Sequence, residues 1–222
     1  METQKHPSNV RIDLVKAVIF DLDGTLLDSF SVHYQVFETM FAAFGIHIQK
    51  EKFLESYSPN WYEIYKAMGL PQDQWQAAND LWLEEAHKRA PLLFGETVGV
   101  LSKLQGRFSL GLVTSGSKNR VEKDLNRNDI KKYFETIVTG DDIHNPKPHP
   151  DGLEIAMREL GVTPKETVYV GDAYDDYRMA AQAGVTFIGV PSEFASLNRN
   201  NPEYPIFNLK EIPVLLGLGI TD

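Results

Sequence analysis

Acidic residues follow two of the apolar segments in this 222-residue chain, at positions where they could share a ligand. Asp21 and Asp23 come directly after the apolar run that ends at Phe20, and Asp172 follows the run that ends at Gly171. Carboxylates brought close together repel one another, and protonation or a hard divalent cation relieves that repulsion. Magnesium prefers a few carboxylates together with water and phosphate oxygens. The acid cluster therefore predicts Mg²⁺ as the cofactor.

Phosphoryl chemistry is the reaction that these residue types suit. Thr114, the backbone amides after it and Lys147 could hold phosphate oxygens. One carboxylate can attack phosphorus as a nucleophile, and a second nearby can act as general acid and then base. The simpler alternatives are structural, since Asp21 and Asp23 could cap the turn that follows them. Thr114 and Ser115 could likewise cap the next helix, and Lys147 alone could be a surface lysine.

Short apolar segments recur along the chain and are rich in β-branched residues. A continuous apolar run is typical of a strand that is buried on both faces, as in a parallel sheet. The predicted strands are Val15–Phe20, Leu110–Thr114, Thr136–Gly140, Thr167–Gly171 and Thr186–Val190, with a weaker one at Tyr204–Phe207. Amphipathic helices lie between them, for example the stripe from Leu153 to Leu160 that stops at Gly161. Alternating strands and helices predict an α/β, doubly wound, Rossmann-like core. Ligands of such sheets bind beyond the carboxyl ends of the strands, where the acids lie.

The segment 30–91 breaks this alternation, because it contains helical patterns and no convincing strand. We therefore expect a small all-helical cap domain at 30–91, inserted into a catalytic core of 1–29 and 92–222. Asp28 and Ser29 are expected to cap its first helix. The segment Phe53–Ile64 is the predicted specificity loop, because Ser58, Pro59 and Asn60 interrupt two helices within it.

Composition excludes several other classes of protein. The net charge of −9 argues against nonspecific nucleic-acid binding, which depends on clustered Lys and Arg. The chain contains no cysteine, so disulfides and thiolate catalysis are excluded. It shows neither a secretion signal nor an apolar run long enough to span a membrane, so we expect a cytoplasmic protein without membrane or nucleic-acid partners. Whether it is a monomer or a homodimer stays open.

Four motifs occur in the order that one family uses, namely "DLDGTLLDS" (21–29), "VTSGS" (113–117), "KPHPD" (147–151) and "GDAYDD" (171–176). The chain resembles the haloacid dehalogenase superfamily, in the phosphatase branch that carries a helical cap after the first motif. Phosphoglycolate phosphatases and β-phosphoglucomutases belong to this branch. The resemblance covers residues 16 to about 190. It implies a phosphoric monoester hydrolase that acts on a small phosphate ester.

The resemblance also implies the catalytic roles. Asp21 would be the nucleophile that forms an aspartyl phosphate, and Asp23 would be the general acid and base. Lys147 would pair with the nucleophile and the phosphate. Dehalogenases of this superfamily lack an acid at the position of Asp23, so the chain is expected to cleave phosphate esters rather than carbon–halogen bonds.

Further positions of the motifs would bind the metal and the substrate. The implied metal ligands are Asp21, Asp23 through its carbonyl group, Asp172 and Asp176. Gly24 would allow a sharp turn, and Thr25 would orient Asp23. The residues expected to touch phosphate or substrate are Gly24, Thr25, Thr114, Ser115, Lys118 and Asn119. Asp175 occupies a variable position of the motif, and its role stays ambiguous.

Two other functions share these residue types. A phosphomutase of the β-phosphoglucomutase type would return the phosphoryl group to another hydroxyl of its substrate. A phospho-aspartate signalling module is the more remote alternative, because such domains are about half as long and lack the "DLDGT" motif. The physiological substrate is not readable from the cap sequence.

Overall fold

The structure, a computed structural model, describes residues 12–56, 61–191, 197 and 204–219. Residues 57–60 of the predicted specificity loop Phe53–Ile64 lie outside these residues. In the described part of the chain, five parallel strands form the main sheet in the order β5-β4-β1-β6-β7. These strands are β1 (Ala17–Phe20), β4 (Ser109–Val113), β5 (Thr136–Val138), β6 (Thr167–Gly171) and β7 (Thr186–Gly189). The predicted α/β class and parallel sheet are confirmed.

The central strand β1 pairs with β4 and with β6, and its last residue lies level with residues near the carboxyl ends of both. Phe20 pairs in register with Leu112 of β4 on one side and Val170 of β6 on the other. All residues of β1 are fully buried, which agrees with its continuous apolar sequence. Because the strands are parallel, the segments that follow β1, β4 and β6 all leave the sheet at the same edge.

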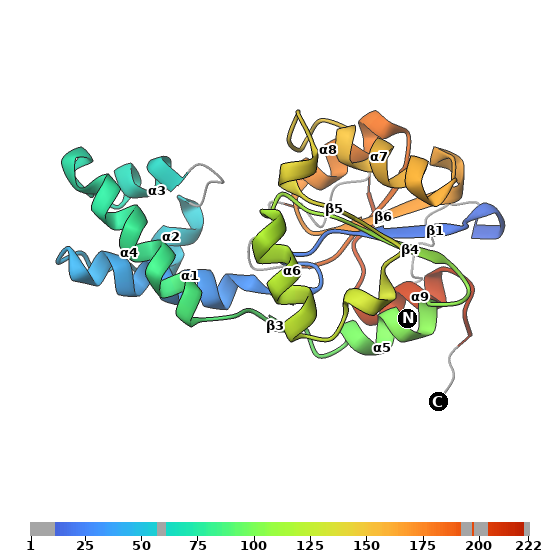
Figure 1. Ribbon diagram of the computed structural model, residues 1–222, viewed down its shortest axis with the longest axis horizontal. Coiled ribbons are helices and arrows are strands. Elements are labelled where there is room, and N and C mark those ends of the chain that lie inside the picture. The colour runs from blue at the N-terminus through green and yellow to red at the C-terminus, as the bar shows by residue number, and fades with distance from the viewer. Residues whose placement is uncertain (1–11, 57–60, 192–196, 198–203, 220–222) are drawn as a thin grey trace, which may run out of the picture. The chain divides into compact units, whose positions relative to one another are not determined.

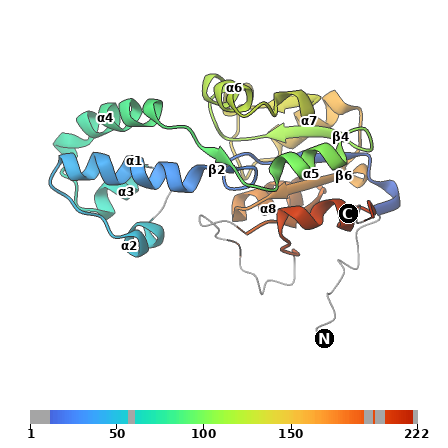
Figure 2. The same ribbon diagram turned by 90° about the horizontal axis from the view of Figure 1, so that it is seen from below.

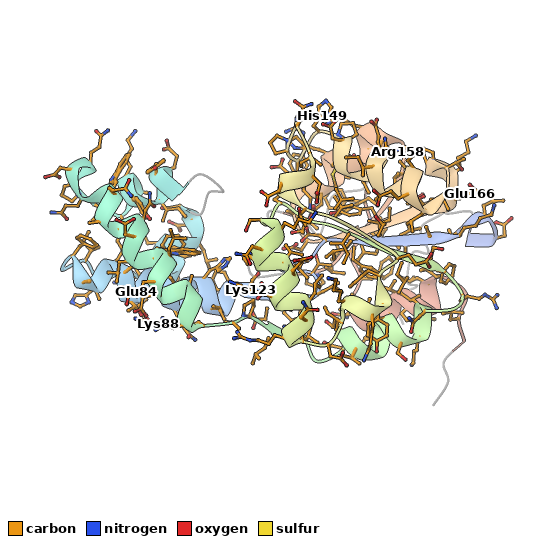
Figure 3. The ribbon with its side chains drawn as sticks, viewed as in Figure 1. Glu84, Lys88, Lys123, His149, Arg158 and Glu166 are labelled. Carbon is orange, nitrogen blue, oxygen red and sulfur yellow. The ribbon has the colours of Figure 1, made fainter. Side chains whose placement is uncertain are left out.

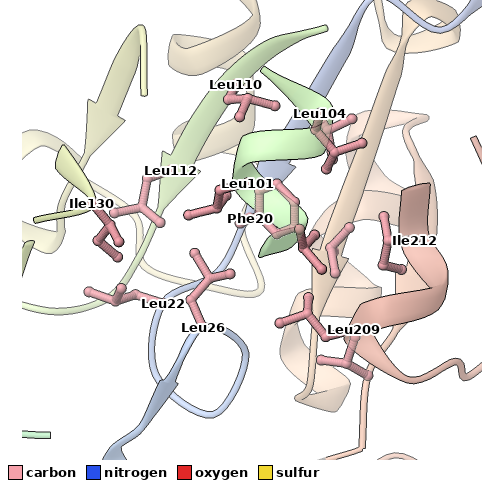
Figure 4. Close-up of a cluster of buried hydrophobic side chains, with 14 of the residues drawn as sticks. Phe20, Leu22, Leu26, Leu101, Leu104, Leu110, Leu112, Ile130, Leu209 and Ile212 are labelled. Carbon is pink, nitrogen blue, oxygen red and sulfur yellow. The ribbon is translucent and has the colours of Figure 1, made fainter. Parts of the chain in front are cut away.

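Helices cover both faces of this sheet (Figures 1 and 2). On one face lie α5 (Thr97–Leu104), α6 (Lys118–Arg127) and α9 (Ile212–Leu215), and on the other α7 (Asp151–Leu160) and α8 (Tyr174–Ala183). Phe20 and Leu112 point into the first face, where Leu101 and Ile212 pack against them in one apolar cluster (Figure 4). Ile19 and Tyr169 point to the opposite face.

Short 3-10 helices connect these elements. They are η1 (Ile12–Leu14), η2 (Gln72–Gln74), η3 (Lys131–Tyr133), η4 (Gly140–Asp142), η5 (Pro164–Glu166) and η6 (Leu209–Glu211). Gly161, at the end of α7, has φ 67°, the left-handed conformation that commonly ends a helix at glycine.

The chain divides into two compact units, Met1–Leu27 with Leu93–Asp222, and Asp28–Leu92. The division falls close to the predicted boundaries at 29/30 and 91/92. The connecting segments β2 (Leu27–Asp28) and β3 (Leu92–Leu93) pair with each other. The roles of catalytic core and cap for the two units stay predictions.

The second unit is helical in its described part. It contains α1 (Ser29–Ala43), α2 (Lys50–Glu55), α3 (Trp61–Ala67) and α4 (Trp75–Lys88). The Asp28 side chain caps α1 by accepting the amide of Ser31 at 3.3 Å. Aromatic side chains fill its interior, where Phe37 packs on Phe41, and Lys88 pairs with Glu84 along α4 (Figure 3).

One predicted strand did not form. Tyr204–Phe207 is not a strand, and only Ile206 makes an isolated bridge to Gly189. The segment is short and contains Pro205, which has no amide to donate to a ladder. Within the described residues, no helix has the length and apolar character needed to cross a membrane.

Candidate active site

The first motif leaves β1 as a tight loop. The amide of Asp21 donates to the carbonyl of Val170 at 2.8 Å, which carries the β1–β6 pairing to the end of the sheet. Gly24 follows with φ 81°, a conformation that favours glycine, and its amide donates to Leu27 at 2.9 Å. This turn holds Asp21 buried, at 6% exposure.

Thr25 reaches a different acid from the one expected. Its hydroxyl donates to Asp172 at 3.1 Å, and both side chains are buried. Thr25 therefore connects the first motif to the last one, across two neighbouring strands of the sheet.

Lys147 lies at the centre of the acidic residues. Its Nζ is 2.5 Å from Oδ1 of Asp21, 2.8 Å from Oδ1 of Asp176 and 2.9 Å from the hydroxyl of Tyr169. Burial lowers the pKa of Lys147, but Asp176 and Asp21 outweigh this and hold the pKa well above its usual value. The lysine therefore carries its charge in the site.

The surroundings of Asp21 shift its pKa in opposite directions. Burial raises the pKa of Asp21 well above its usual value, and Lys147 opposes this shift. The neighbouring carboxylates of Asp176 and Asp172 raise the pKa of Asp21 further. A cation beside these acids would favour the ionised form that a nucleophile needs.

Asp176 is fixed by the first turn of α8. Its Oδ2 accepts the amides of Asp172 at 3.2 Å and Ala173 at 3.0 Å. Gly171 makes room for it, because a Cβ there would lie 2.6 Å from the same oxygen. By contrast, the Asp175 side chain is half-exposed and faces Arg178 at 3.8 Å.

Carboxylate oxygens of Asp21, Asp172 and Asp176 lie within 4.8 Å of one another, the group among the described residues that could hold a metal ion. All three side chains are buried, and hard oxygen donors of this kind suit Mg²⁺. The Asp23 side chain turns instead toward Arg120. Its predicted carbonyl contact to the metal stays a prediction.

The loop after β4 lies beside these acids. Thr114 is buried, and its Oγ1 accepts the amide of Gly116 at 3.2 Å. The carbonyl of Gly116 accepts the amide of Gly140 at 2.9 Å, which holds the loop against η4. Neither Thr114 nor Ser115 caps the next helix, since its N-cap position is Ser117.

Lys118 and Asn119 are exposed at the start of α6. The amide of Lys118 donates to Asp141 at 2.8 Å, and its Nζ lies 3.4 Å from Asp142. Asp141 thus supplies the capping bond for α6. The predicted contacts of Lys118 and Asn119 with substrate stay predictions.

Two residues of the site were not anticipated. Tyr169 donates to Val113 at 3.2 Å and also contacts Lys147 and Asp176. Arg120 pairs with both carboxylate oxygens of Asp23. In the sequence, Tyr169 is one apolar position of a buried strand, and Arg120 is one polar position of a surface helix.

Comparison with known proteins agrees with this geometry. The sequence matches the haloacid dehalogenase-like hydrolase family over residues 18–190. It is 31% identical over 215 residues to the pyrophosphatase PpaX of Bacillus pumilus, covering 94% of this chain and 98% of that protein. It is 26% identical over 235 aligned positions to phosphoglycolate phosphatase of Escherichia coli, covering 92% of this chain and 93% of that protein. The crystal structure of a HAD-superfamily hydrolase of subfamily IA from Geobacter sulfurreducens superposes with a TM-score of 0.73 at 27% identity, covering 92% of this chain and 97% of that one.

The chain therefore belongs to the haloacid dehalogenase-like hydrolases. Within that family it is a phosphatase, related to PpaX and to phosphoglycolate phosphatase.

Proposed function

We propose that this protein is a Mg²⁺-dependent phosphatase of small phosphorylated metabolites and that it acts through an aspartyl-phosphate intermediate. The observation that carries the proposal is the contact of Lys147 with Asp21, beside the buried acids Asp172 and Asp176. Phosphoglycolate fits the name of one relative and pyrophosphate the name of the other, and sugar phosphates are further candidates.

The first step transfers the phosphoryl group to the protein. A carboxylate oxygen of Asp21 attacks phosphorus while the bond to the leaving oxygen breaks. Asp23 donates its proton to that oxygen, which leaves as an alcohol or an acid. Thr114 and Lys147 bind the phosphoryl oxygens and hold phosphorus in line with Asp21.

The second step restores Asp21. Asp23, now ionised, takes a proton from a water molecule that attacks the aspartyl phosphate, and inorganic phosphate leaves. Mg²⁺ held by Asp21, Asp172 and Asp176 would neutralise negative charge on the phosphoryl oxygens.

Replacing the nucleophile tests this proposal. Asp21→Asn should abolish hydrolysis of p-nitrophenyl phosphate, while its circular-dichroism spectrum stays that of the wild type. Asp175→Asn is the matched control, because Asp175 lies in the same motif but is half-exposed and outside the acid cluster, and it should retain activity. Near-normal turnover by Asp21→Asn would falsify the role of the nucleophile.

Product analysis separates hydrolysis from phosphoryl transfer between hydroxyls. With β-glucose 1-phosphate as substrate, a phosphatase releases inorganic phosphate, whereas a phosphomutase yields an isomeric sugar phosphate without it. We expect inorganic phosphate.

A further inference from the structure

Asp23 is held by a cation that the first motif does not contain. Nη1 of Arg120 lies 3.0 Å from Oδ1 of Asp23, and Nη2 bonds to Oδ2. The guanidinium therefore engages both oxygens of the acid in the two-pronged geometry that Arg forms with carboxylates. The two residues are 97 positions apart in the sequence.

Arg120 is held in place from two further sides. Nη1 also lies 3.1 Å from Oδ2 of Asp124, a buried acid one turn later on α6. On another side lies Gly116, where an added Cβ would come 2.2 Å from Nη2 and 3.0 Å from Cζ. The guanidinium thus lies between Asp23 and the loop that follows Thr114.

This arrangement conflicts with the role of Asp23 in the proposed reaction. A general acid must come within about 3 Å of the leaving oxygen to transfer its proton. Both carboxylate oxygens of Asp23 are bonded to Arg120. Each of those bonds occupies an acceptor site on Asp23, so releasing one of them makes that oxygen more accessible to the leaving group.

We propose that Arg120 determines specificity by binding an anionic group carried on the leaving group of the substrate, a carboxylate or a second phosphoryl group. This inference rests on the proposed phosphatase function. The anion takes the place of Asp23 on the guanidinium, and Asp23 becomes available to the leaving oxygen.

Geometry and charge both support the exchange. A leaving oxygen within reach of Asp23 places its next substituent close to Arg120, which is 3.0 Å from the same carboxylate. The guanidinium fork matches carboxylate and phosphate groups equally well. Arg120 keeps two anionic partners before and after the exchange, namely Asp124 and either Asp23 or the substrate, so the partly buried cation stays paired.

A pair of substrates isolates the anionic group. Phosphoglycolate and 2-hydroxyethyl phosphate have the same two-carbon leaving group, but the first carries a carboxylate where the second has a neutral hydroxymethyl group. The kcat and KM values of both would be measured for the wild type, Arg120→Gln, Arg120→Lys and Arg127→Gln. Arg127 is an exposed arginine of the same helix and serves as the matched control.

We expect the wild type and Arg127→Gln to prefer phosphoglycolate by at least tenfold in kcat/KM. Arg120→Gln should reduce this preference about 10- to 100-fold, mainly through a higher KM for phosphoglycolate. Arg120→Lys should restore part of it, because lysine supplies the charge without the fork. Gly116→Ala, which displaces the guanidinium without removing it, should reduce the preference in the same direction.

Equal losses on both substrates would overturn the proposal, because Arg120 would then only position Asp23. An unchanged preference in Arg120→Gln, or no preference in the wild type, would overturn it as well. The proposed function is tested separately by turnover of p-nitrophenyl phosphate. If the protein does not hydrolyse p-nitrophenyl phosphate, calorimetry still tests the role of Arg120 by measuring phosphoglycolate binding to Asp21→Asn and to Asp21→Asn/Arg120→Gln. Binding that is tenfold weaker in the double variant supports the inference, and equal binding refutes it.

Discussion

Gly171 is the residue whose replacement tests the architecture of the acidic cluster most directly. It ends β6, and an added Cβ would lie 2.6 Å from Oδ2, 2.7 Å from Cγ and 2.8 Å from Cβ of Asp176. Ordinary contact begins at 3.4 Å, so Gly171→Ala requires a shift of about 0.8 Å. The backbone of Gly171 is not in the left-handed region, so alanine adds no strain of its own.

The cost follows from the bonds that Asp176 makes. A shift of that size lengthens its contacts with the amides of Asp172 and Ala173, now at 3.2 and 3.0 Å, beyond normal hydrogen-bonding distance. Hydrogen bonds to charged groups contribute about 1.5 kcal/mol or more each, so their loss costs roughly 3 kcal/mol. Alanine recovers about 0.5–1 kcal/mol by restricting the unfolded chain. We expect a net destabilisation of about 2 kcal/mol.

Activity should fall together with stability. Asp176 contacts Lys147 at 2.8 Å, so displacing the acid moves the lysine that touches Asp21. Urea unfolding would give the free energy of unfolding, and p-nitrophenyl phosphate hydrolysis should drop at least tenfold. Gly99→Ala is the control, because Gly99 lies in α5 and its added Cβ would meet no described atom within 4 Å. That variant should gain about 0.5–1 kcal/mol and keep its activity. Native stability and activity in Gly171→Ala would refute the reasoning.

Three further predictions concern the same chain. Tyr169→Phe keeps a buried ring but removes the hydroxyl beside Lys147, so kcat should fall about tenfold with little change in KM; steady-state kinetics checks this, and an unchanged kcat contradicts it. Chelation with EDTA should abolish activity, and added Mg²⁺ should restore it and raise the melting temperature; activity that survives dialysis against EDTA contradicts the metal assignment. Asp28→Ala removes the cap of α1 and should cost about 1 kcal/mol in thermal unfolding, whereas Gln49→Ala, at an N-cap position without a described side-chain bond, should cost less; equal effects would contradict the capping role.

The sheet could be predicted from the sequence because its strands carry a local pattern. β1 and β6 are short, continuous apolar segments followed directly by acids, and burial on both faces selects for that composition. Their parallel pairing then brings Asp21 and Asp172 to one edge. Tyr204–Phe207 misled the prediction, since an apolar tetrapeptide with a proline resembles a strand by composition, but its pairing with β7 stops after a single bridge.

Arg120 could not be found in this way, because its partner is distant in the sequence. Its spacing to Asp124 is i,i+4, which is typical of an exposed ion pair on a helix surface. Only the packing of α6 against the first motif brings it to Asp23. Thr25 illustrates the same limit, since its bond to Asp172 joins residues 147 positions apart.

Asp21 and Asp23 stand two residues apart, yet each contacts a different cation. Lys147 contacts Asp21 and Asp176, whereas Arg120 contacts Asp23 and Asp124. The Asp21 side chain is 8% exposed and that of Asp23 is 26% exposed, so the proposed nucleophile is shielded while the proposed acid and base can reach water. Two carboxylates in one site can have different roles when their surroundings differ. In the proposed mechanism the two cations are not interchangeable, because Lys147 stays with the phosphoryl group through both steps, whereas Arg120 exchanges Asp23 for the anionic group of the substrate.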